Sequence, residues 1–220
     1  MKITIEYDRV YHIFNRGNNY ENIFVDKGDY KNFMEFYYIY IDSIADTYAY
    51  CLLRNHFHVL LRVKNESQIG YFNSDDACSE NLAKKWKTYF PEKSGLKFQK
   101  KPKPHGQFQH LFASYTKYFN KKHGRAGSLF TKTYKRVMVD SRKYFTNLIV
   151  YLHNNPVKHG FTEHPGDYPW SSYQALLSTN KTKLKREDVI KHFHDLENYR
   201  YMHRTLAQDD EDGLKGLIVE

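Results

Sequence analysis

Two histidines separated by one residue, His56 and His58, are the side chains whose spacing first indicates chemistry. They lie in segment 54–63, where apolar and polar residues alternate with a period of two, which predicts a β-strand. Side chains two positions apart in a strand point to the same face, so both imidazoles project together. Two imidazoles on one rigid face can chelate a divalent metal ion. The pair alone, however, favours the simpler alternative of two unrelated strand histidines.

A second His-Phe-His tripeptide, His192 to His194, serves as an internal comparison. Apolar residues around it have helical spacing, and a helix is predicted over 186–203. On a helix, residues i and i+2 diverge by roughly 200°, so these two histidines cannot bind one ion together. The same tripeptide therefore predicts a metal site in the strand and none in the helix.

A third ligand and a nucleophile can come from a later helix. This helix is predicted to begin at a cap, Asp140 or Ser141, and to run to about residue 154, before Pro156. Tyr151 lies at the edge of its apolar stripe, and Asn155 follows one turn later on the same side. A phenol and an amide oxygen facing two imidazoles would form a plausible phosphoryl-transfer site. The chain has 20 tyrosines, most of which must be packing residues, so the pattern alone does not select Tyr151.

The elements that must position these residues are read from hydrophobic periodicity. Strands are expected over 10–16, 47–53, 54–63 and 128–139, with one helix capped by Asp26 and another starting near residue 106. Tyr115 falls on the apolar stripe of the second helix and is expected in the core. The order strand, helix, strand, strand, helix, strand is typical of an α+β, ferredoxin-like split βαβ fold, an antiparallel sheet with helices on one face. To this fold the chain adds the tyrosine-bearing helix and a helical C-terminal extension.

Composition favours a nucleic-acid partner. The formal net charge is +9 and aromatic residues make up 17% of the chain. Phosphates attract the charge and unstacked bases stack on aromatic rings, although tyrosines packed in a core would give the same numbers. No apolar run is long enough to span a bilayer, and the N-terminus lacks a signal-peptide core. Two cysteines are too few for a disulfide framework, so a reducing cytoplasmic location is expected.

We expect a catalytic domain over 1–175 with a basic insertion at about 64–105, and a helical extension over 176–220. The second half of the insertion carries eight lysines against one acid, with aromatic rings between them. It could follow single-stranded nucleic acid, or it could be a solvated surface segment; the two alternatives are about equally supported. The acidic end, 209–212, is expected to be frayed and solvated.

Together these segments resemble a known family. His56-Phe57-His58 matches the HUH motif of single-strand DNA nucleases that use one catalytic tyrosine, and segment 151–160 is similar to the tyrosine helix of REP-associated tyrosine transposases. Segments 15–18, 124–139 and 168–172 also fit, so the resemblance runs from about residue 10 to 173. The motif alone is weakly specific, whereas the motif followed by the Tyr-to-Asn-Pro block is strongly specific.

The resemblance implies a transposase that cleaves single-stranded DNA at hairpins or repeats and transfers the strand. Tyr151 would be the nucleophile and form a 5′-phosphotyrosine. His56 and His58, with Asn155 as a less secure third ligand, would hold Mg²⁺ or Mn²⁺. The partner would be single-stranded or hairpin DNA on the bacterial nucleoid and no membrane, and the tyrosine would serve its own subunit or the other subunit of a homodimer. The residues expected to contact DNA are Arg16, Arg54, Arg125, Lys132, Lys135 and Arg136.

Two other functions remain open on the sequence. The first is a non-catalytic module whose sheet stacks the bases of single-stranded nucleic acid. The second is metal-dependent hydrolysis with water as the nucleophile and no covalent intermediate. Tyr118 and Tyr134 are the next candidates for the nucleophile if Tyr151 does not act.

Overall fold

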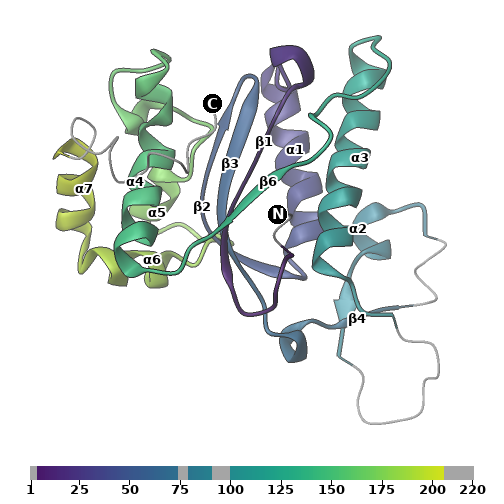
Figure 1. Cartoon of the computed structure of the whole chain (residues 1–220), viewed down its shortest axis with the longest axis horizontal. Coiled ribbons are helices and arrows are strands. Elements are labelled where there is room, and N and C mark those ends of the chain that lie inside the picture. Colours follow the sequence, from purple (N-terminus) through teal and green to yellow (C-terminus); the bar gives the residue numbers. More distant parts are fainter. Residues whose placement is uncertain (1–3, 74–78, 91–99, 206–220) are drawn as a thin grey trace.

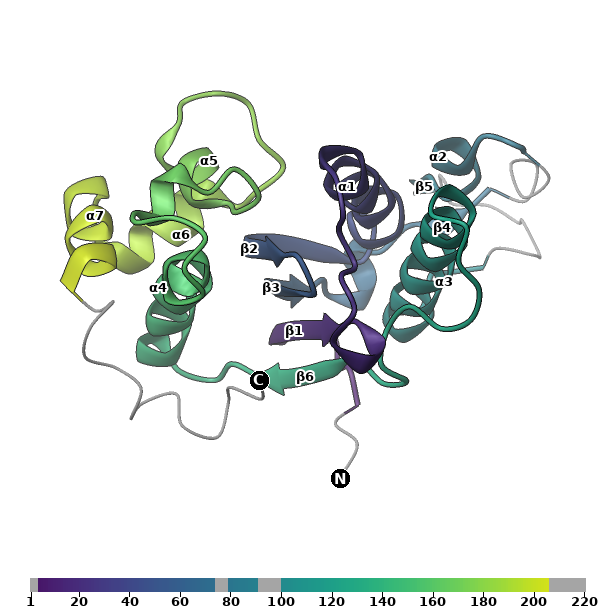
Figure 2. The same cartoon turned by 90° about the horizontal axis from the view of Figure 1, so that it is seen from above.

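The computed structural model describes residues 4–73, 79–90 and 100–205, which are arranged in three layers (Figures 1 and 2). The middle layer is a four-stranded sheet made of β1 (Val10–Arg16), β2 (Ala45–Leu53), β3 (His56–Val63) and β6 (Lys135–Met138). Two helices cover one face, α1 (Lys27–Ile41) and α3 (Pro104–Lys122). On the other side lie α4 (Arg142–Lys158), α5 (Tyr173–Leu177), α6 (Arg186–Phe193) and α7 (Leu196–Thr205).

The sheet has the strand order β2-β3-β1-β6, and each strand is antiparallel to its neighbours. The histidine-bearing strand β3 is therefore central, hydrogen-bonded to β2 on one side and to β1 on the other. The expected mixture of helices with an antiparallel sheet is confirmed. A strand paired on both edges is a stiff support for side chains that must hold a fixed geometry.

Alternation along β3 divides its side chains between two hydrophobic cores. Phe57, Val59 and Leu61 are buried in the core shared with α1 and α3. Leu60 belongs to the second core, which is shared with α4, α5, α6 and α7. His56 and His58 have the parity of Leu60, so both imidazoles project toward the layer that contains the tyrosine-bearing helix.

The expected strand over 128–139 is wrong in its first half. Strand β6 covers only Lys135–Met138, and the residues before it form an isolated bridge between Gly17 and Phe130 and a few hydrogen bonds near the end of β1, such as Thr131 N to the Arg16 carbonyl at 3.0 Å, but no continuous ladder. Phe130 and Tyr134 turn toward α3 instead, where both rings contact Phe112. Burial of these rings against the helix replaces ladder pairing.

The tyrosine-bearing helix does not stop before Pro156. Ser141 is its N-cap, as expected for one of the two candidates, but α4 continues through Pro156 to Lys158. Proline removes one backbone donor and crowds the carbonyl four residues earlier, so a proline inside a helix requires compensation. Pro156 is buried, and its carbonyl accepts a hydrogen bond from the Phe161 amide at 2.8 Å, so packing and local bonding offset the loss.

The helix expected over 186–203 is two helices. α6 ends at Phe193 and α7 begins at Leu196, with His194 at φ +73° between them. His192 packs its ring on Phe145 with centroids 4.2 Å apart, while His194 lies beyond the helix end. His192 and His194 therefore do not share one face, which agrees with the prediction that they cannot bind one ion together.

The insertion after β3 contains short elements: a 3-10 helix (Glu66–Gln68), β4 (Tyr71–Phe72), α2 (Leu82–Lys85) and β5 (Thr88–Tyr89). β4 and β5 form a two-stranded sheet separate from the main one. The lysines at 93 and 97 and the acidic end at 209–212 lie outside the described residues. Within the described parts of the chain, no helix is both long and apolar enough to cross a bilayer.

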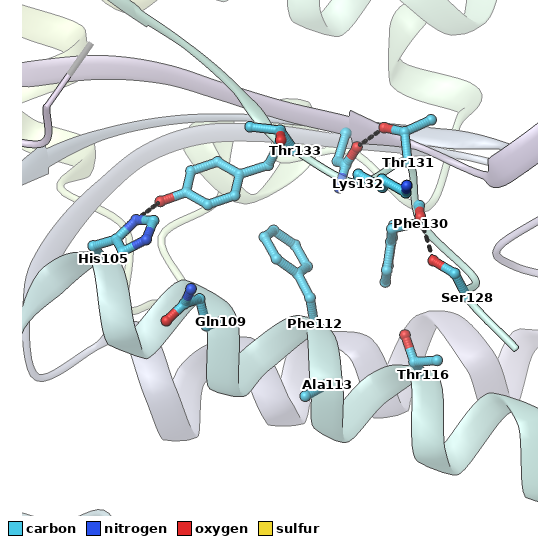
Figure 3. Close-up of a pocket in the computed structure, with 12 residues that line it drawn as sticks. His105, Gln109, Phe112, Ala113, Thr116, Ser128, Phe130, Thr131, Lys132 and Thr133 are labelled. Atoms are coloured by element: carbon cyan, nitrogen blue, oxygen red, sulfur yellow. Dashed lines mark hydrogen bonds between the residues drawn. The ribbon is translucent and has the colours of Figure 1, made fainter. Parts of the chain in front are cut away.

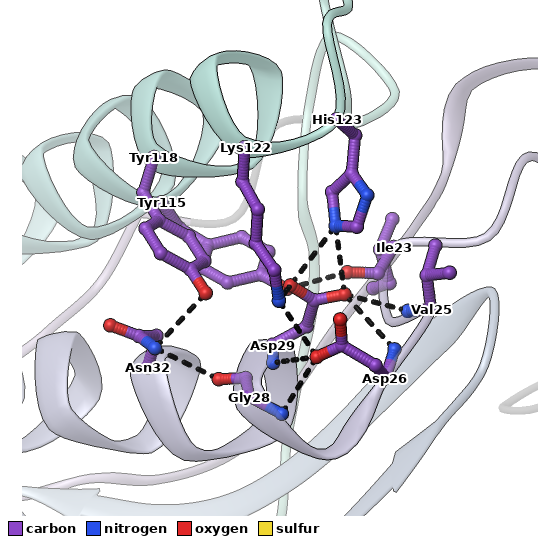
Figure 4. A network of polar contacts seen from close by, with 10 residues as sticks. All are labelled: Ile23, Val25, Asp26, Gly28, Asp29, Asn32, Tyr115, Tyr118, Lys122 and His123. Atoms are coloured by element: carbon purple, nitrogen blue, oxygen red, sulfur yellow. Dashed lines mark hydrogen bonds and ion pairs between the residues drawn. The ribbon is translucent and has the colours of Figure 1, made fainter.

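Asp26 caps α1 as expected and joins a charged network between α1 and α3 (Figure 4). The ligand atoms of Asp26, Asp29 and His123 lie within 4.8 Å of one another, a grouping that could suit a metal ion. However, Lys122 Nζ lies 2.7 Å from Asp26 Oδ1 and 2.8 Å from Asp29 Oδ1. The lysine ammonium already supplies the positive charge, so this cluster is an ion-pair network that fixes α3 to the start of α1.

We expect the network to make stability depend on acid pH. Burial alone would raise the pKa of Asp29, but hydrogen bonds from Lys122, the Val25 amide and His123 lower it below its usual value. A carboxylate with a lowered folded pKa stabilises the fold above its unfolded pKa of about 3.9, and the contribution is lost as pH falls through the folded pKa. Asp29→Asn should therefore lower the free energy of unfolding at pH 7 by about 2 kcal/mol.

Urea unfolding of the wild type and of Asp29→Asn between pH 7 and acid pH measures this effect. The difference between their free energies of unfolding should shrink below about pH 4. Glu35→Gln, which neutralises an exposed carboxylate on the same helix, is the matched control. An Asp29→Asn variant as stable as the wild type at pH 7 would show that the network does not stabilise the fold.

Candidate active site

The two histidines of β3 are extended into a row of side chains by strand β1. In the antiparallel register His58 lies opposite Phe14, and His56 lies opposite Arg16. The His56 and His58 ring centroids are 5.1 Å apart with perpendicular planes. An arginine thus stands beside the imidazole pair on the same sheet face, as cross-strand pairing requires.

His58 is held by a buried partner that the sequence did not indicate. His12 Nε2 lies 2.9 Å from His58 Nδ1, and both side chains are buried. Burial lowers the pKa of His12 to about 3, and burial with the neighbouring histidines His12, His56 and His159 lowers the pKa of His58 well below its usual value. Both rings are therefore neutral at pH 7, which is the form of imidazole that binds metals.

A hydrogen bond of this kind can orient an imidazole that binds a metal ion through its other nitrogen. If His58 Nδ1 carries the proton and donates the hydrogen bond to His12, then Nε2 of His58 keeps a lone pair that can bind a metal ion. On the other histidine, Nδ1 lies 2.7 Å from Asn55 Oδ1. One nitrogen of each imidazole is thus held by a hydrogen bond, and two imidazoles on one face suit a divalent ion.

Helix α4 brings Tyr151 to this face of the sheet. The Ser141 hydroxyl accepts a hydrogen bond from the Tyr144 amide and starts the helix. Apolar residues of α4 pack against β2 and β3, and Tyr151 lies at the half-buried edge of that packing. Its ring centroid is 6.0 Å from that of His58, with the planes at 83°. The ring of His159, at the end of the same helix, is 5.4 Å from that of His56.

One pocket of about 550 Å³ joins the strand and the helix. Its wall contains both histidines of β3, the phenol of Tyr151, two basic side chains and several polar groups. The lining residues are Phe14, Asn15, Arg16, Tyr20, Asn55, His56, His58, Thr131, Thr133, Lys135, Tyr151 and His159. Residues nearly a hundred positions apart in the sequence therefore face one cavity large enough for part of a nucleotide.

Asn155 is deeply buried, with 1% of its surface exposed, and does not line this pocket. Its Nδ2 donates a weak hydrogen bond of 3.4 Å to the Tyr151 carbonyl, one turn earlier. Its Oδ1 is buried and has no hydrogen-bond partner among the described residues. A buried amide oxygen without a partner is unusual and is the hard donor that Mg²⁺ or Mn²⁺ prefers. Imidazole nitrogens and an amide oxygen are the kinds of donor that such an ion takes, but Asn155 does not share the pocket of the histidines.

The six basic residues expected to contact DNA are placed differently. Arg16 and Lys135 line the pocket. Arg54 is exposed, with its guanidinium 5.6 Å from the Phe161 ring centroid. The Arg125 guanidinium is bonded to Asn120 and to Glu21, outside the pocket. Lys132 lines a different pocket, beside α3, and Arg136 in β6 has its guanidinium 5.1 Å from the Tyr134 ring centroid.

A second pocket of about 370 Å³ lies between α3 and the loop that precedes β6 (Figure 3). Phe112 and Phe130 point toward each other across it, and Lys132 lies on its loop side. Asn15, Thr131 and Thr133 line both pockets, and Thr131 Oγ1 donates to Asn15 Oδ1 at 2.6 Å. The loop therefore forms a shared wall between the two cavities.

Sequence reasoning missed His12 and gave His159 no role. His12 could have been found from strand parity, because it shares a face with Phe14 and Arg16 in a strand that was predicted correctly. Which residue of β3 it contacts depends on strand register, which the sequence left open. His159 reaches the pocket only because α4 continues beyond Pro156.

Tyr115, which was expected in the core, and the alternative nucleophiles Tyr118 and Tyr134 lie elsewhere. Tyr115 is fully buried, as expected, and donates a hydrogen bond to the Ile23 carbonyl at 2.6 Å. The Tyr118 hydroxyl accepts one from Asn32 beside the ion-pair network. The Tyr134 hydroxyl is hydrogen-bonded to His105 at 3.0 Å, in the second pocket. None of the three lines the pocket that contains the β3 histidines.

A buried polar network attaches the C-terminal helices to the tyrosine-bearing helix. His153, two residues after Tyr151, is hydrogen-bonded through Nδ1 to His203 Nε2 of α7 at 2.9 Å. Through Nε2 it is hydrogen-bonded to Ser172 Oγ at 2.7 Å, and that hydroxyl in turn contacts the backbone of Tyr50 in β2. These side chains are at most 1% exposed. The network therefore fixes the orientation of α4 relative to the sheet.

We expect His203→Ala to destabilise the protein by about 2–4 kcal/mol, because it leaves a buried cavity and removes the partner of His153. Thermal or urea unfolding followed by circular dichroism measures the effect. Tyr201→Ala on the same helix, whose side chain is 55% exposed, is the control and should change stability by less than about 0.5 kcal/mol. Equal losses in the two variants would contradict a specific role for the network.

Comparison with known proteins extends the description of the fold. No protein-family model and no curated protein sequence matches the chain. Among solved structures, the fold is that of a DNA-bound transposase: the chain superposes on a REP-associated tyrosine transposase bound to a REP hairpin. The TM-score is 0.51 with 14% sequence identity, over 81% of this chain and 87% of the other. At this identity the likeness concerns the fold, and residue roles must be argued from the site.

Proposed function

We propose that this protein is a single-strand DNA endonuclease and transposase-type strand transferase of the HUH class, related to the REP-associated tyrosine transposases. The observation that carries the proposal is the pocket in which Tyr151 faces His56 and His58 beside Arg16 and Lys135. A phenol, two imidazoles and two cations form a set suited to phosphoryl transfer. The strand order supports the further inference that the core fold is a ferredoxin-like split βαβ unit.

In the proposed reaction the Tyr151 oxygen attacks a phosphorus atom of the DNA backbone. A phosphorus–oxygen bond to the tyrosine forms, and the bond from phosphorus to the 3′ oxygen breaks. The phenol loses one proton and the departing 3′ oxygen gains one, which leaves a 5′-phosphotyrosine and a free 3′-hydroxyl. A 3′-hydroxyl can reverse the step on another end, so the bond energy is retained and no nucleotide cofactor is needed.

His56, His58 and Asn155 would hold Mg²⁺ or Mn²⁺, which polarises the scissile phosphate when bound. His12 orients His58 through their hydrogen bond. Arg16 is held over the Tyr20 ring, 4.5 Å from its centroid, and with Lys135 it places positive charge in the pocket for the phosphates next to the cleaved one. Because Tyr151 and the histidines line one pocket of a single chain, we infer that the tyrosine acts on its own subunit's site.

We propose hairpin or repeat DNA as the substrate, by analogy with the hairpin in the similar structure. The test uses a hairpin with a single-stranded flank, labelled at either end, incubated with the protein and Mn²⁺. A 5′-phosphotyrosine requires the 3′-labelled fragment to remain covalently on the protein while the 5′-labelled fragment is released. Release of both fragments would favour hydrolysis by water, and binding without cleavage would favour a non-catalytic single-strand-binding module.

A further inference from the structure

The insertion after β3 and the start of α3 form a pocket of about 410 Å³ that the proposed reaction does not use. It shares no lining residue with the pocket around Tyr151. Aromatic rings and lysines dominate its wall, and no aspartate or glutamate is among the described residues that line it. The lining includes Phe72, Lys85, Trp86, Lys100, Gln107 and His110.

Trp86 is fixed as a platform within this pocket. Its ring centroid lies 4.6 Å from that of His110, 5.1 Å from that of Phe72 and 5.3 Å from that of Tyr40. The side chain is nonetheless half-buried rather than fully enclosed. A rigid, partly exposed indole held by other rings is suited to stack on a planar group without losing conformational freedom.

Positive charge gathers around this platform, and the described residues that line the pocket include no acid to balance it. Lys100 and Lys103 are exposed, and Lys85 is half-buried beside the indole. Burial, together with the charges of Lys100 and Lys85, lowers the pKa of His110, as expected where cations crowd together. Lys101 is already used, since its Nζ donates to the Glu66 carbonyl at 2.9 Å.

Gln107 lines this pocket, and its side-chain oxygen can act as a hydrogen-bond acceptor. Gln107 is 2% exposed, and its Oε1 is buried without a hydrogen-bond partner among the described residues. An amide oxygen in this position can accept a hydrogen bond from the imino or amino group of a nucleobase. Stacking surface, base-edge acceptor and surrounding lysines together match a nucleotide with its neighbouring phosphates.

We propose that this pocket is a second binding site for single-stranded nucleic acid, in which an unpaired base stacks on Trp86, bonds to Gln107 and has its phosphates neutralised by Lys85, Lys100 and Lys103. Single-stranded rather than duplex nucleic acid is required because the indole and the amide can reach only an unstacked base. The site shares its ligand class with the proposed function but does not depend on chemistry at Tyr151.

Fluorescence tests the proposal directly, because the chain has only two tryptophans, Trp86 and Trp170. In a Trp170→Phe background, titration with oligothymidylate should quench the fluorescence of Trp86. An oligomer of abasic deoxyribose phosphate should bind about tenfold more weakly and should not quench. Absence of quenching by oligothymidylate, or equal quenching by a blunt DNA duplex, would overturn the proposal.

Charge and base contact are then separated by two variants in the same background. Lys85→Gln/Lys100→Gln/Lys103→Gln should weaken binding and reduce the slope of log affinity against log salt by about 2, at roughly 0.7 per phosphate contact. Gln107→Leu should weaken binding of oligothymidylate but not of the abasic oligomer. The matched control, Lys31→Gln/Lys117→Gln/Lys121→Gln, removes the same charge from exposed positions of α1 and α3. An equal loss in this control would overturn the site.

The reaction at Tyr151 and the binding site at Trp86 can be contradicted independently of each other. The lysine variant should form the covalent adduct normally with a saturating short hairpin substrate, because none of its changes touches the Tyr151 pocket. Quenching of Trp86 without any adduct in the wild type would contradict the proposed reaction alone. Adduct formation without quenching would contradict the second site alone.

Discussion

Replacing Tyr151 by phenylalanine is expected to abolish the covalent protein–DNA adduct completely. The change removes one oxygen atom, which is the proposed attacking group, and keeps the ring that packs at the edge of α4. Of the three tyrosines considered as nucleophiles, Tyr151 alone lines the pocket of His56 and His58, where the other phenol is that of Tyr20 beside Arg16. The measurement is denaturing gel electrophoresis of the 3′-labelled hairpin strand after incubation with Mn²⁺, with no shifted band in the variant.

Two further substitutions control for the loss of a phenol in general. Tyr118→Phe and Tyr134→Phe remove hydroxyls that are hydrogen-bonded elsewhere, to Asn32 and His105. Both variants should form the adduct at rates close to that of the wild type. An adduct that persists in Tyr151→Phe, or disappears only in one of the controls, would show that the nucleophile has been assigned to the wrong tyrosine.

The second large effect is expected from His56→Ala combined with His58→Ala. Removing both imidazoles should eliminate binding of Mn²⁺ at this site in calorimetry and should eliminate the adduct, while hairpin binding through the basic residues remains. Retained hairpin binding distinguishes loss of the ion from loss of the fold. Unchanged adduct formation would rule out a role for the histidine pair.

A smaller effect on metal binding is expected from changing His12, which is hydrogen-bonded to His58. His12→Phe keeps the ring volume but removes the hydrogen-bond partner of His58, and should weaken metal binding by about 10–100-fold.

Mixing Tyr151→Phe with the double histidine variant tests which subunit supplies the tyrosine. No adduct should form in the mixture if the tyrosine and the metal site belong to the same chain, whereas a restored adduct would indicate exchange between subunits.

Much of the fold could be predicted because its signals are local. Strand β1 has the predicted bounds, Asp26 caps α1 and Ser141 caps α4. Alternation placed His56 and His58 on one face because strand periodicity is a property of the backbone itself. The errors occurred where packing outweighs a local rule: buried Pro156 remains helical, and the rings of Phe130 and Tyr134 draw the chain away from strand pairing.

The placement of the basic residues shows the same division. The six DNA contacts were expected from charge and position in the chain. Charge does not reveal which partner a side chain contacts in the folded protein. Arg16 and Lys135 reach the pocket, whereas Arg125 is engaged by Glu21 and Asn120. Gln107 and Trp86 gave no sequence signal that linked them, although they line one cavity.

The strand with two imidazoles on one face, and the helix with Tyr151 at the edge of its apolar stripe, follow from local sequence patterns. The folded chain adds that these halves meet, that His12 supports His58 and that the Asn155 oxygen is buried without a partner among the described residues. The difference is the distance along the chain over which each interaction acts. Periodicity and capping act within a few residues, whereas a site requires the register of strands and the docking of a helix, which depend on contacts between distant parts of the chain.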